Sequence, residues 1–387
     1  MHPSEEIRFE RGEELKGKKI CLCVTGSIAC TESFYLCRDL IRHGADVHVF
    51  MTESSTKFLH PDLFEFASGN KVVTSLSGEV EHLTLCGDSD LVIVSPCTAN
   101  TISKVAFGIA DNPVTTCVVS AMGKGKPIIM VPAMHLSLLE GVKDNMERLK
   151  KKGIIFLEPR IEGDRAKIPE RETILENVIR VLRENDLEGR KVLIIGGASA
   201  ERIDDIRVLT NRSSGRFAVE LAREAFERGA YVELWHGWMR VRIPPFIPSR
   251  KFEGVGDLLG MLKDVKGFDF VIVCAALSNY IPRAMDGKIP SGIKGLTIDM
   301  DPAPNILEEI KRAGRSKIVA FKAEEKEDEL ISRCEEMVKD YHMVVGNLLT
   351  SFGEEKTTIW IFRDGRVSRF EGDKRILSRY IIDEMVR

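Results

Sequence analysis

The feature that most constrains the fold of this chain is an apolar run followed by an amphipathic stretch, repeated along almost its whole length. The first apolar run is Lys19–Val24, and the segment after it places Leu36, Leu40 and Ile41 on one helical face. Strands that alternate with helices in this way are typical of a parallel sheet with helices on both faces. The sequence therefore predicts an α/β fold.

The pattern runs through the chain twice, which predicts two doubly wound, Rossmann-like domains. Further strand candidates lie at 47–51, 90–94, 127–131 and 154–157, and then at 192–195, 232–234, 270–274, 317–321 and 343–345. Residues 218–228 indicate a helix that ends at Gly229, and residues 357–361 and 366–369 indicate a hairpin around Asp364-Gly365. The expected division is an N-terminal extension (1–17), a flavodoxin-like parallel-sheet domain (18–182), a polar linker (183–190) and a second domain (191–387).

Composition excludes several classes of function. The chain has 387 residues and a formal net charge of −3, so it lacks the basic surplus of a nucleic-acid-binding protein. No apolar run reaches the roughly 18–20 residues of a membrane helix, and the charged N-terminus does not resemble a signal peptide. The nine cysteines contain no CxxC pair, so we expect reduced thiols in a cytoplasmic protein. Cys21, Cys23 and Cys274 lie in apolar strands, where core packing is expected, and no cluster has zinc-ligand spacing.

Three polar segments of the first half follow predicted strands, where the ligands of such sheets bind. Thr25–Ala29 opens a helix, so its backbone N–H groups and the Ser27 hydroxyl suit a phosphate, although an ordinary tight turn fits equally well. Met51–Ser55 adds hydroxyls to the same place or simply caps a helix. Ser95–Thr101 suits a loop under a flat ring, with a capped helix start as the alternative.

Two histidines of the first half are candidates for chemistry. His82 lies shortly before the strand at 90–94, and a single histidine is more often structural than catalytic. His135 follows the strand that ends at Val131, which places it at the carboxyl edge of the predicted sheet. Loop histidines are common at such positions without any catalytic role, so the residues themselves leave both interpretations open.

The second half has its own polar loops after predicted strands. Residues 203–207 lead into Asn211–Arg216, a glycine-containing stretch before a helix that suits a phosphate or carboxylate ligand. Further loops lie at 275–280, 288–290 and 304–306. Lys288 would neutralise a phosphate in a nucleotidyl transfer. Solvated loops and a solvated surface lysine are the alternatives.

In their order along the chain, these motifs resemble a family of bifunctional enzymes of coenzyme A biosynthesis. In this family a phosphopantothenoylcysteine decarboxylase is joined to a phosphopantothenate–cysteine ligase, and the resemblance runs from about Lys18 to the C-terminus. The matching segments are Gly26–Ala29, Met51–Ser54, the His82 segment, Ser95–Asn112, Pro132–His135, Ile203–Ala218, Ala275–Tyr280, Lys288–Ser291, Ala303–Ile306, Val319–Glu324 and Gly346-Asn347.

For the first half, the resemblance implies an FMN-dependent decarboxylase of phosphopantothenoylcysteine. The cysteine thiol would be oxidised to a thioaldehyde, CO2 would leave, and the reduced flavin would return its electrons to give phosphopantetheine. His82 matches the family's catalytic histidine, a proton-transfer role, and His135 is a second catalytic candidate. The FMN phosphate would be held by Gly26, Ser27, Ile28 and Thr52, and the flavin would lie near Ser95, Thr98, Ala99 and Asn100.

For the second half, the resemblance implies that CTP or ATP, with Mg2+, activates the phosphopantothenate carboxylate and that the cysteine amine captures the acyl-nucleotidylate. Asn211 and Arg207 would contact the substrate, and Lys288 would assist nucleotidyl transfer. The nucleotide contacts would be Gly196, Ala275, Asn279, Lys288, Ala303, Pro304, Asn305, Ile306, Phe321 and Lys339. The family also implies a homo-oligomer, with FMN between subunits of a trimeric decarboxylase, a dimeric ligase and an assembly as large as a dodecamer.

The chain departs from the family pattern in both halves, in ways that resemble an archaeal branch. His135 stands where bacterial decarboxylases carry asparagine, and residues 162–167 lack the cysteine of the mobile flap that supplies the last proton. Lys167 or another group would have to replace that donor. Asn279 stands where an aspartate is usual, and the motif at Lys288 is less basic than in bacteria, which bears on the nucleotide preference.

Other functions fit part of the pattern. One is a flavin-dependent oxidative decarboxylase of another cysteine-terminated substrate, which would have no use for the loops at Asn211 and Lys288. Another is a non-enzymatic flavin-binding regulatory protein, which the retention of His82 with those two residues disfavours. A nucleotide-sugar dehydrogenase is disfavoured because the chain contains no GxGxxG motif.

Overall fold

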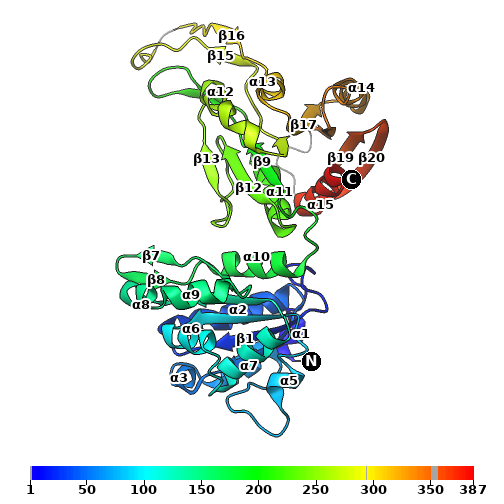
Figure 1. Ribbon diagram of the computed structural model, residues 1–387. Helices are drawn as coiled ribbons and strands as arrows, with labels where there is room; N and C mark the ends of the chain where they lie inside the picture. Colours follow the sequence, from blue (N-terminus) through cyan, green and yellow to red (C-terminus); the bar gives the residue numbers. More distant parts are fainter. Residues whose placement is uncertain (1, 293, 350–355) are drawn as a thin grey trace. The chain divides into compact units, whose positions relative to one another are not determined.

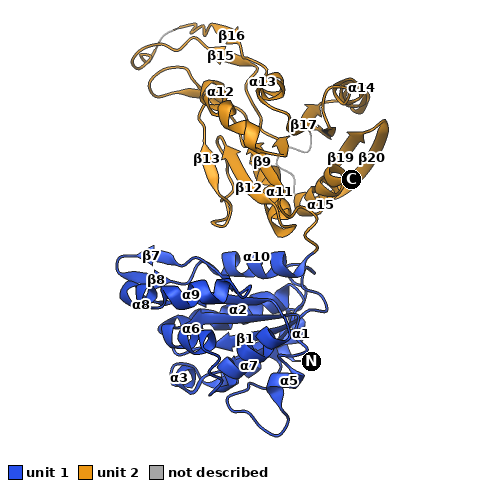
Figure 2. Cartoon of the chain, in the orientation of Figure 1, with its two compact units in different colours: residues 1–183 blue, residues 184–387 orange. Residues whose placement is uncertain are grey.

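A computed structural model describes residues 2–292, 294–349 and 356–387 of the chain. The chain divides into two compact units, residues 1–183 (unit 1) and residues 184–387 (unit 2), drawn in different colours in Figure 2. Each unit has hydrophobic cores of its own. Among the described residues, no helix combines the length and the apolar character that a membrane span requires.

Unit 1 is built around a parallel sheet with the strand order β2-β1-β3-β4-β6 (Figure 1). The strands are β1 (Lys19–Val24), β2 (Asp46–Met51), β3 (Leu91–Cys97), β4 (Ile128–Pro132) and β6 (Ile155–Phe156). The direction of strand addition reverses between β1 and β3. In sheets of this kind, ligands bind at that reversal, outside the carboxyl ends of the strands.

Helices cover both faces of this sheet. One face carries α2 (Thr31–Arg42), α4 (Pro61–Ser68) and α10 (Arg171–Leu182), and the other carries α6 (Ala99–Ala106), α7 (Pro113–Gly123) and α9 (Lys143–Lys150). Shorter helices are α1 (Pro3–Glu6), η1 (Ile28–Cys30), α3 (Glu53–Thr56), α5 (Glu81–Thr84) and α8 (Leu136–Gly141). In α2, Leu36, Leu40 and Ile41 are buried against the sheet, as the apolar spacing predicts.

A small antiparallel sheet, β5-β8-β7, lies at the carboxyl edge of the main sheet. It consists of β5 (Met134–His135), β8 (Arg165–Lys167) and β7 (Arg160–Glu162), and β5 begins shortly after β4 ends. In Figure 1, α3, α8 and the β7–β8 hairpin lie at one end of unit 1, and α5 lies at the other. The N-terminal segment packs onto unit 1, since Leu15 is fully buried and the Arg8 guanidinium donates to the Ala45 carbonyl (2.9 Å).

Unit 2 contains a larger sheet with the order β13-β12-β9-β14-β17-β18-β19-β20. The strands are β9 (Lys191–Gly196), β12 (Tyr231–His236), β13 (Ser249–Lys251), β14 (Phe270–Val273), β17 (Lys317–Glu324), β18 (Met343–Leu348), β19 (Lys356–Arg363) and β20 (Arg366–Asp373). Pairing is parallel from β13 to β18 and antiparallel for β19 and β20. Strand addition reverses between β9 and β14.

Helices also cover both faces of the sheet of unit 2. One face carries α11 (Arg216–Glu227) and α15 (Lys374–Val386), and the other carries α12 (Val255–Met261), η2 (Leu262–Gly267) and α13 (Ile306–Ala313), with α14 (Glu327–Met337) over β17 and β18. Two ribbons extend from the sheet, β10 (Ala200–Arg202) with β11 (Val208–Thr210) and β15 (Tyr280–Pro282) with β16 (Met300–Pro302).

The α/β fold with two doubly wound sheets is confirmed, and each apolar run named from the sequence forms a strand. The expected late hairpin is β19–β20, which turns at Asp364-Gly365. Other strands of two or three residues were not predicted, because they are too short to show a hydrophobic period. They are β5, β7, β8, β10, β11, β13, β15 and β16.

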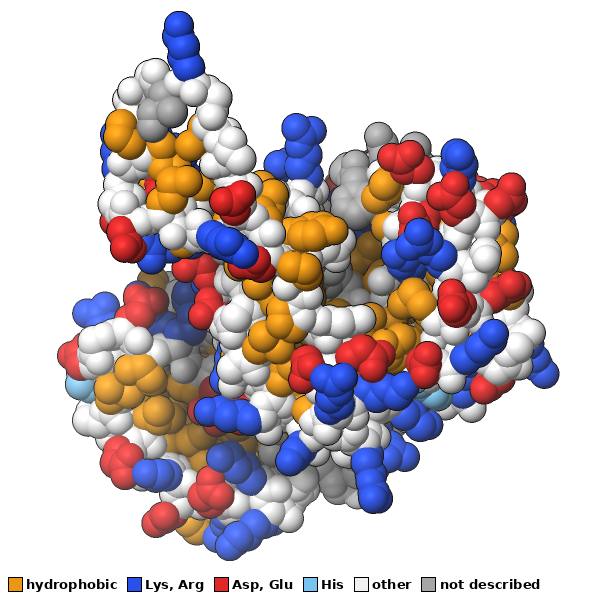
Figure 3. All heavy atoms as spheres, turned by 90° about the horizontal axis from the view of Figure 1, so that it is seen from above, with side chains coloured by type: hydrophobic (Ala, Val, Ile, Leu, Met, Phe, Trp, Pro, Cys, Tyr) orange, Lys and Arg blue, Asp and Glu red, His pale blue; other side chains and the backbone are white. Residues whose placement is uncertain are grey.

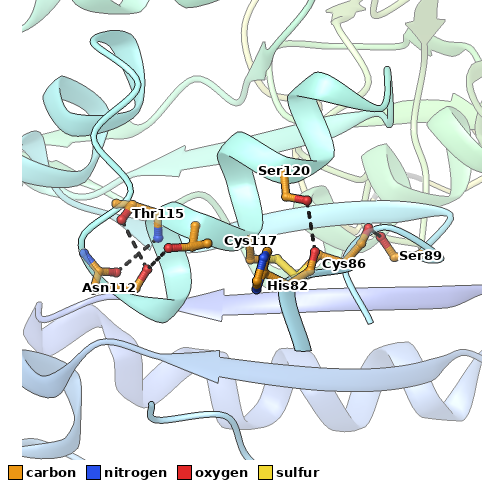
Figure 4. Close-up of a disulfide and its surroundings, with 8 residues drawn as sticks. His82, Cys86, Ser89, Asn112, Thr115, Cys117 and Ser120 are labelled. Atoms are coloured by element: carbon orange, nitrogen blue, oxygen red, sulfur yellow. Dashed lines mark hydrogen bonds between the residues drawn. A yellow bond between two sulfur atoms is a disulfide. The ribbon is translucent and has the colours of Figure 1, made fainter. Parts of the chain in front are cut away.

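The prediction that the cysteines are reduced thiols is wrong for one pair. Cys86 and Cys117 form a disulfide, with their Cα atoms 5.5 Å apart (Figure 4). They are separated by 31 positions and meet only because α5 packs against α7, so no local sequence pattern reveals them. Cys21 and Cys23 are buried in β1, as predicted, whereas Cys274 is only partly buried.

Candidate active sites

The loops after β1, β2 and β3 meet at the carboxyl edge of unit 1. The Thr25 hydroxyl donates to the Pro96 carbonyl (2.8 Å), which joins the loop after β1 to the end of β3. The Ser55 hydroxyl donates to the Val24 carbonyl (3.0 Å), which joins the loop after β2 to β1. The three segments predicted to hold a flavin are therefore adjacent in the fold.

Gly26 permits a close approach between two of these segments. A Cβ at Gly26 would lie 2.4 Å from Oγ of Ser54, whose hydroxyl is in turn 3.0 Å from that of Thr52. Ser27 caps the short helix η1, and Ile28 beside it is 72% exposed. Hydroxyls and backbone N–H groups gathered at a helix start form a cradle that suits an anionic group such as a phosphate.

Ser95 is the buried polar residue of this edge that lacks a partner. Its hydroxyl oxygen is inaccessible to solvent and has no hydrogen-bond partner among the described residues, although its carbonyl accepts from the Ser33 hydroxyl (2.7 Å). A buried hydroxyl without a partner costs free energy that a bound ligand would recover. Thr98 caps α6, and Ala99 and Asn100 begin that helix. These predicted flavin residues therefore share the same edge as Gly26.

His135 connects this edge to the β7–β8 hairpin. Its Nε2 lies 2.7 Å from Oδ2 of Asp164, and its Nδ1 lies 2.9 Å from Oγ of Ser137. The hydrogen bond from His135 lowers the pKa of Asp164. Asp164 lies in the turn between β7 and β8, so the pair connects this hairpin to the segment that follows β4. No local sequence pattern indicates the His135–Asp164 contact. Lys167, the candidate replacement donor, forms an ion pair with Glu162.

His82 does not join the other predicted residues of unit 1. It lies in α5, where its carbonyl accepts from the Ser120 hydroxyl (3.0 Å) near the end of α7. Helix α7 ends just before β4 begins, so this is the amino end of the sheet, and Figure 1 shows α5 and α3 at opposite ends. A strand as long as β3 separates the two ends by about 20 Å. Within one subunit, His82 is therefore remote from Ser95.

The larger of two adjacent cavities in unit 2 has a volume of about 630 Å³ and lies at the carboxyl ends of β14 and β17. The Ala303 N–H donates to the Asn279 carbonyl (2.9 Å), and Asn305 caps α13, so the loops that carry these residues form one wall. The predicted nucleotide residues that line the cavity are Ala275, Asn279, Ala303, Pro304, Asn305, Ile306 and Phe321.

A smaller cavity of about 170 Å³ lies beside it, at the start of α11, and shares Ala275, Phe321 and Lys322 with the larger one. Among the described residues, its lining includes the cations Arg216, Lys322 and Lys374 and no acidic side chain. Such a lining suits an anionic group. Arg216 and Lys322 lie inside motifs that match the family, so the sequence could have indicated them as candidate site residues. Lys374 lies outside every motif, so no such signal was present for it.

Asn211 lies next to the cavities, because its Nδ2 donates to the Ala276 carbonyl (3.0 Å). Gly196 lies under α11, where a Cβ would be 2.1 Å from that of Ala218, so it permits the helix to approach β9. Lys339, at the end of α14, is exposed and does not line either cavity.

Arg207 and Lys288 also lie outside the two cavities. Arg207 forms an ion pair with the buried carboxylate of Asp204, which also accepts the Ile289 N–H (3.0 Å). This N–H bond is the main reason why the pKa of Asp204 lies far below its usual range. One carboxylate therefore holds the Arg207 loop and the Lys288 loop together.

The exposed surface of unit 2 carries charges of both signs. Figure 3 shows Lys and Arg side chains mixed with Asp and Glu, and hydrophobic side chains gathered between them. Exposed hydrophobic residues of this unit include Ile206, Tyr280, Met285, Leu296 and Met300. Charges of both signs are therefore interspersed over the face that this view shows.

Comparisons with known proteins identify the family. A family model described as "Flavoprotein" matches residues 8–183, and one described as "DNA/pantothenate metabolism flavoprotein C-terminal domain" matches residues 187–387. The "Coenzyme A biosynthesis bifunctional protein CoaBC" of Thermococcus kodakarensis is 41% identical, over 100% of this chain and 99% of the relative. The chain belongs to the CoaBC family.

Another CoaBC protein, from Methanocaldococcus jannaschii, is 35% identical over 100% of this chain and 97% of the relative. Among solved structures, the "C-terminal Domain of Coenzyme A biosynthesis bifunctional protein CoaBC" is 24% identical, covers 52% of this chain and 97% of its own, and has a TM-score of 0.46. The resemblance to the CoaBC family seen in the sequence is confirmed, and unit 1 is a flavoprotein.

Proposed function

We propose that unit 2 joins cysteine to 4'-phosphopantothenate at the expense of a nucleoside triphosphate and that unit 1, with FMN, decarboxylates the resulting phosphopantothenoylcysteine. As a member of the CoaBC family, the chain is a bifunctional enzyme of coenzyme A biosynthesis, a decarboxylase joined to a ligase. The alternatives of a decarboxylase for another substrate and of a regulatory protein are not favoured, because the family match spans both units.

The single observation that carries the proposal is where the two sets of site residues lie. Polar loops gather at the β1/β3 reversal in unit 1. In unit 2, the smaller cavity lies near the β9/β14 reversal, and the larger one lies beside it at the ends of β14 and β17. These are the positions at which doubly wound sheets bind their ligands.

In unit 2, we assign the nucleoside to the larger cavity and phosphate groups to the smaller, cationic one. The phosphopantothenate carboxylate attacks the α-phosphorus of CTP or ATP and pyrophosphate leaves. The cysteine amine then attacks the acyl carbon and the nucleoside monophosphate leaves. Lys322 and Lys374 would offset the charge that develops on the phosphates, and Mg2+ bound with the nucleotide would supply further positive charge there. Asn211 would hold the acyl-nucleotidylate.

In unit 1, the residues present fit a flavin nucleotide. The cradle at Gly26, Ser27 and Thr52 suits its phosphate. The buried hydroxyl of Ser95 has no hydrogen-bond partner among the described residues, and the flavin ring system would supply one. FMN, when bound, supplies reversible two-electron chemistry at the cysteine-derived thiol. Ser95, Thr98 and Asn100 would orient it, and the His135–Asp164 pair would hold the hairpin over the substrate.

We assign proton transfer to His82, contributed by a neighbouring subunit. His82 lies at the amino end of the sheet, about 20 Å from the flavin residues of its own chain, so a complete site requires a second copy. This geometry supports the expected homo-oligomer, with a trimeric decarboxylase and a dimeric ligase, up to a dodecamer.

The direct test incubates the purified protein with phosphopantothenate, cysteine, Mg2+ and either CTP or ATP and measures the masses of the products. Phosphopantetheine would support both activities, and the faster nucleotide would define the preference. Phosphopantothenoylcysteine that accumulates without loss of CO2 would contradict the role assigned to unit 1. An absence of ligation with either nucleotide would contradict the role assigned to unit 2.

A second test concerns the flavin site alone. Ser95→Ala should lose flavin without losing stability, because the hydroxyl has no protein partner to lose. The matched control is Ser89→Ala, just before the same strand, whose hydroxyl donates to the Cys86 carbonyl (2.8 Å). This control should lose stability but keep its flavin. Full flavin content in Ser95→Ala would contradict the assignment.

A further inference from the structure

The disulfide of unit 1 lies next to the histidine to which we assign proton transfer. Figure 4 shows His82 beside the Cys86–Cys117 bond, with Ser120 and Ser89 close by. Cys117 belongs to α7, whereas Cys86 follows α5, about one helical turn after His82. The bond therefore attaches the segment that carries His82 to a helix packed on the sheet.

The segment that carries His82 has little packing of its own. None of residues 74–85 is buried, and the first buried residue after Val73 is Cys86. Val80 begins α5 with φ at +48°, a left-handed conformation that β-branched residues rarely adopt. Segments with few buried contacts open locally at low cost. The position of His82 therefore depends on the attachments at the end of α5.

The attachments at that end include two side-chain hydrogen bonds and one covalent bond. The Ser120 hydroxyl donates to the His82 carbonyl (3.0 Å), and the Ser89 hydroxyl donates to the Cys86 carbonyl (2.8 Å). The third is the covalent Cys86–Cys117 bond. The Ser120 bond is only partly buried, and the Ser89 bond, although buried, joins two residues three positions apart in the same segment. The covalent bond, in contrast, links this segment to α7 and persists until it is chemically reduced. The disulfide is thus the durable attachment.

We propose that Cys86 and Cys117 are positioning residues that form a thiol–disulfide switch, so that reduction of their bond lowers decarboxylation and leaves ligation unchanged. The inference rests on the proposed role of His82. A dithiol reductant supplies the two electrons and two protons: the Cys86–Cys117 bond breaks to give two thiols, and the dithiol becomes a cyclic disulfide. In the reverse direction, a low-molecular-weight disulfide accepts the two electrons and two protons and becomes two thiols, which restores the Cys86–Cys117 bond and the position of His82.

A third thiol lies in the same cluster. The sulfur atoms of Cys21, Cys86 and Cys117 all lie within 4.8 Å of one another. Burial raises the pKa of the Cys21 thiol to about 12, so it stays protonated at neutral pH and is a poor nucleophile toward the bond. The pairing of Cys86 with Cys117 is therefore kept, and Cys21 provides a matched control.

The test uses the full-length, flavin-loaded protein in three states: as purified, reduced with dithiothreitol, and re-oxidised. Thiol labelling and mass spectrometry record the state of the bond before and after each assay. Reduction should lower kcat for decarboxylation about 10-fold or more, since a small misplacement of a catalytic group has effects of this size. KM, flavin content and the ligation rate should stay the same, and re-oxidation should restore kcat.

Variants separate the switch from general damage. The double variant Cys86→Ser/Cys117→Ser should decarboxylate slowly in every state, and Cys21→Ser should respond to reduction as the unaltered protein does. His82→Asn should abolish decarboxylation. If it does and the reduced protein keeps its full kcat, only the switch is overturned. If His82→Asn keeps full activity, the proposed role of His82 fails and the switch fails with it. Should the double variant not fold, reversible reduction of the unaltered protein decides.

Discussion

The glycine at position 26 shows how the absence of one Cβ shapes the proposed flavin site. Its missing Cβ leaves room for Ser54, whose Cβ and Oγ would otherwise lie 2.6 and 2.4 Å away. Gly26→Ala should therefore push the loops after β1 and β2 apart. We expect most of the flavin to be lost and the free energy of unfolding of unit 1 to fall by about 1–3 kcal/mol.

Visible absorbance of the purified protein measures the flavin loss, and denaturant unfolding measures the stability. Gly123→Ala is the matched control, because a Cβ at Gly123 would meet no heavy atom within 4 Å. It should keep its flavin. A Gly26→Ala protein that contains as much flavin as the control would contradict the phosphate cradle.

Asp204 fixes two loops of unit 2 with one carboxylate. It accepts the backbone N–H groups of Ile289 (3.0 Å), Ile206 (2.8 Å) and Arg207 (2.6 Å), and it pairs with the Arg207 guanidinium. Asp204→Asn removes the charge, so the Arg207 and Lys288 loops should loosen. We expect the ligation rate to fall about 10-fold while decarboxylation stays unchanged as the internal control. If Asp204→Asn and the unaltered protein ligate at the same rate, the position of these loops has no role in ligation.

The same carboxylate predicts a pH dependence of stability. The pKa of Asp204 in the folded protein lies below its usual value of 3.8, mainly because of the Ile289 N–H. A lowered pKa contributes stability at every pH above 3.8, and the contribution is lost as the pH falls below that value. The difference in melting temperature between the unaltered protein and Asp204→Asn should therefore be constant from pH 7 to about pH 5 and shrink only in stronger acid. A difference that is largest at acidic pH would contradict the assignment.

In unit 1, the β7–β8 hairpin is joined to β5 by strand pairing, and its turn is joined to β5 by one side-chain pair. His135 and Asp164 lie 2.7 Å apart, and the Leu136 N–H donates to the Asp164 carbonyl (2.9 Å). If the pair works by holding the hairpin, His135→Ala and Asp164→Asn should each slow decarboxylation several-fold. The double variant should be no slower than either single variant, because the same contact is lost in all three.

A double-mutant cycle on kcat/KM for decarboxylation measures this coupling. Glu140→Gln is the control: it breaks another exposed ion pair of this region, between Glu140 and Lys143 (3.3 Å), which has no assigned role. It should leave the rate unchanged. Additive effects of the His135 and Asp164 variants would show that the two residues act separately.

For the whole molecule, the placement of His82 predicts that two copies of the chain build one decarboxylase site. Ser95 lies at the carboxyl edge of the sheet and His82 at the amino edge, about 20 Å apart within one subunit. Ser95→Ala and His82→Asn should each be inactive in decarboxylation. Mixed oligomers obtained by co-expression of the two variants should recover part of the activity, since some sites then combine two intact residues.

Light scattering should show that each variant alone has the same oligomeric state as the unaltered protein. The ligation rate of each sample reports the amount of folded protein. If mixed oligomers form and remain inactive in decarboxylation, both residues act within one subunit and the proposed shared site is wrong.

The elements of this fold were predictable because each carries a local signal. The central strands of both sheets are apolar runs that helices bury on two faces, and α2 shows its buried stripe in the spacing of Leu36, Leu40 and Ile41. Short ribbons such as β15–β16 carry too few residues to show a period. The Cys86–Cys117 disulfide and the position of Lys374 at the smaller cavity depend on contacts between distant segments.

By itself, the sequence determined the fold class, the CoaBC family and the loops that carry the chemistry, since hydrophobic period and ordered motifs are local properties of a chain. Tertiary structure alone decided which of those loops meet. It placed the residues that we assign to the flavin at one edge and His82 at the other, gathered three cations around one cavity, and left Lys288 and Lys339 outside both cavities. The physical reason is that strand order and helix packing, which no local pattern encodes, set the distances between residues far apart in the chain.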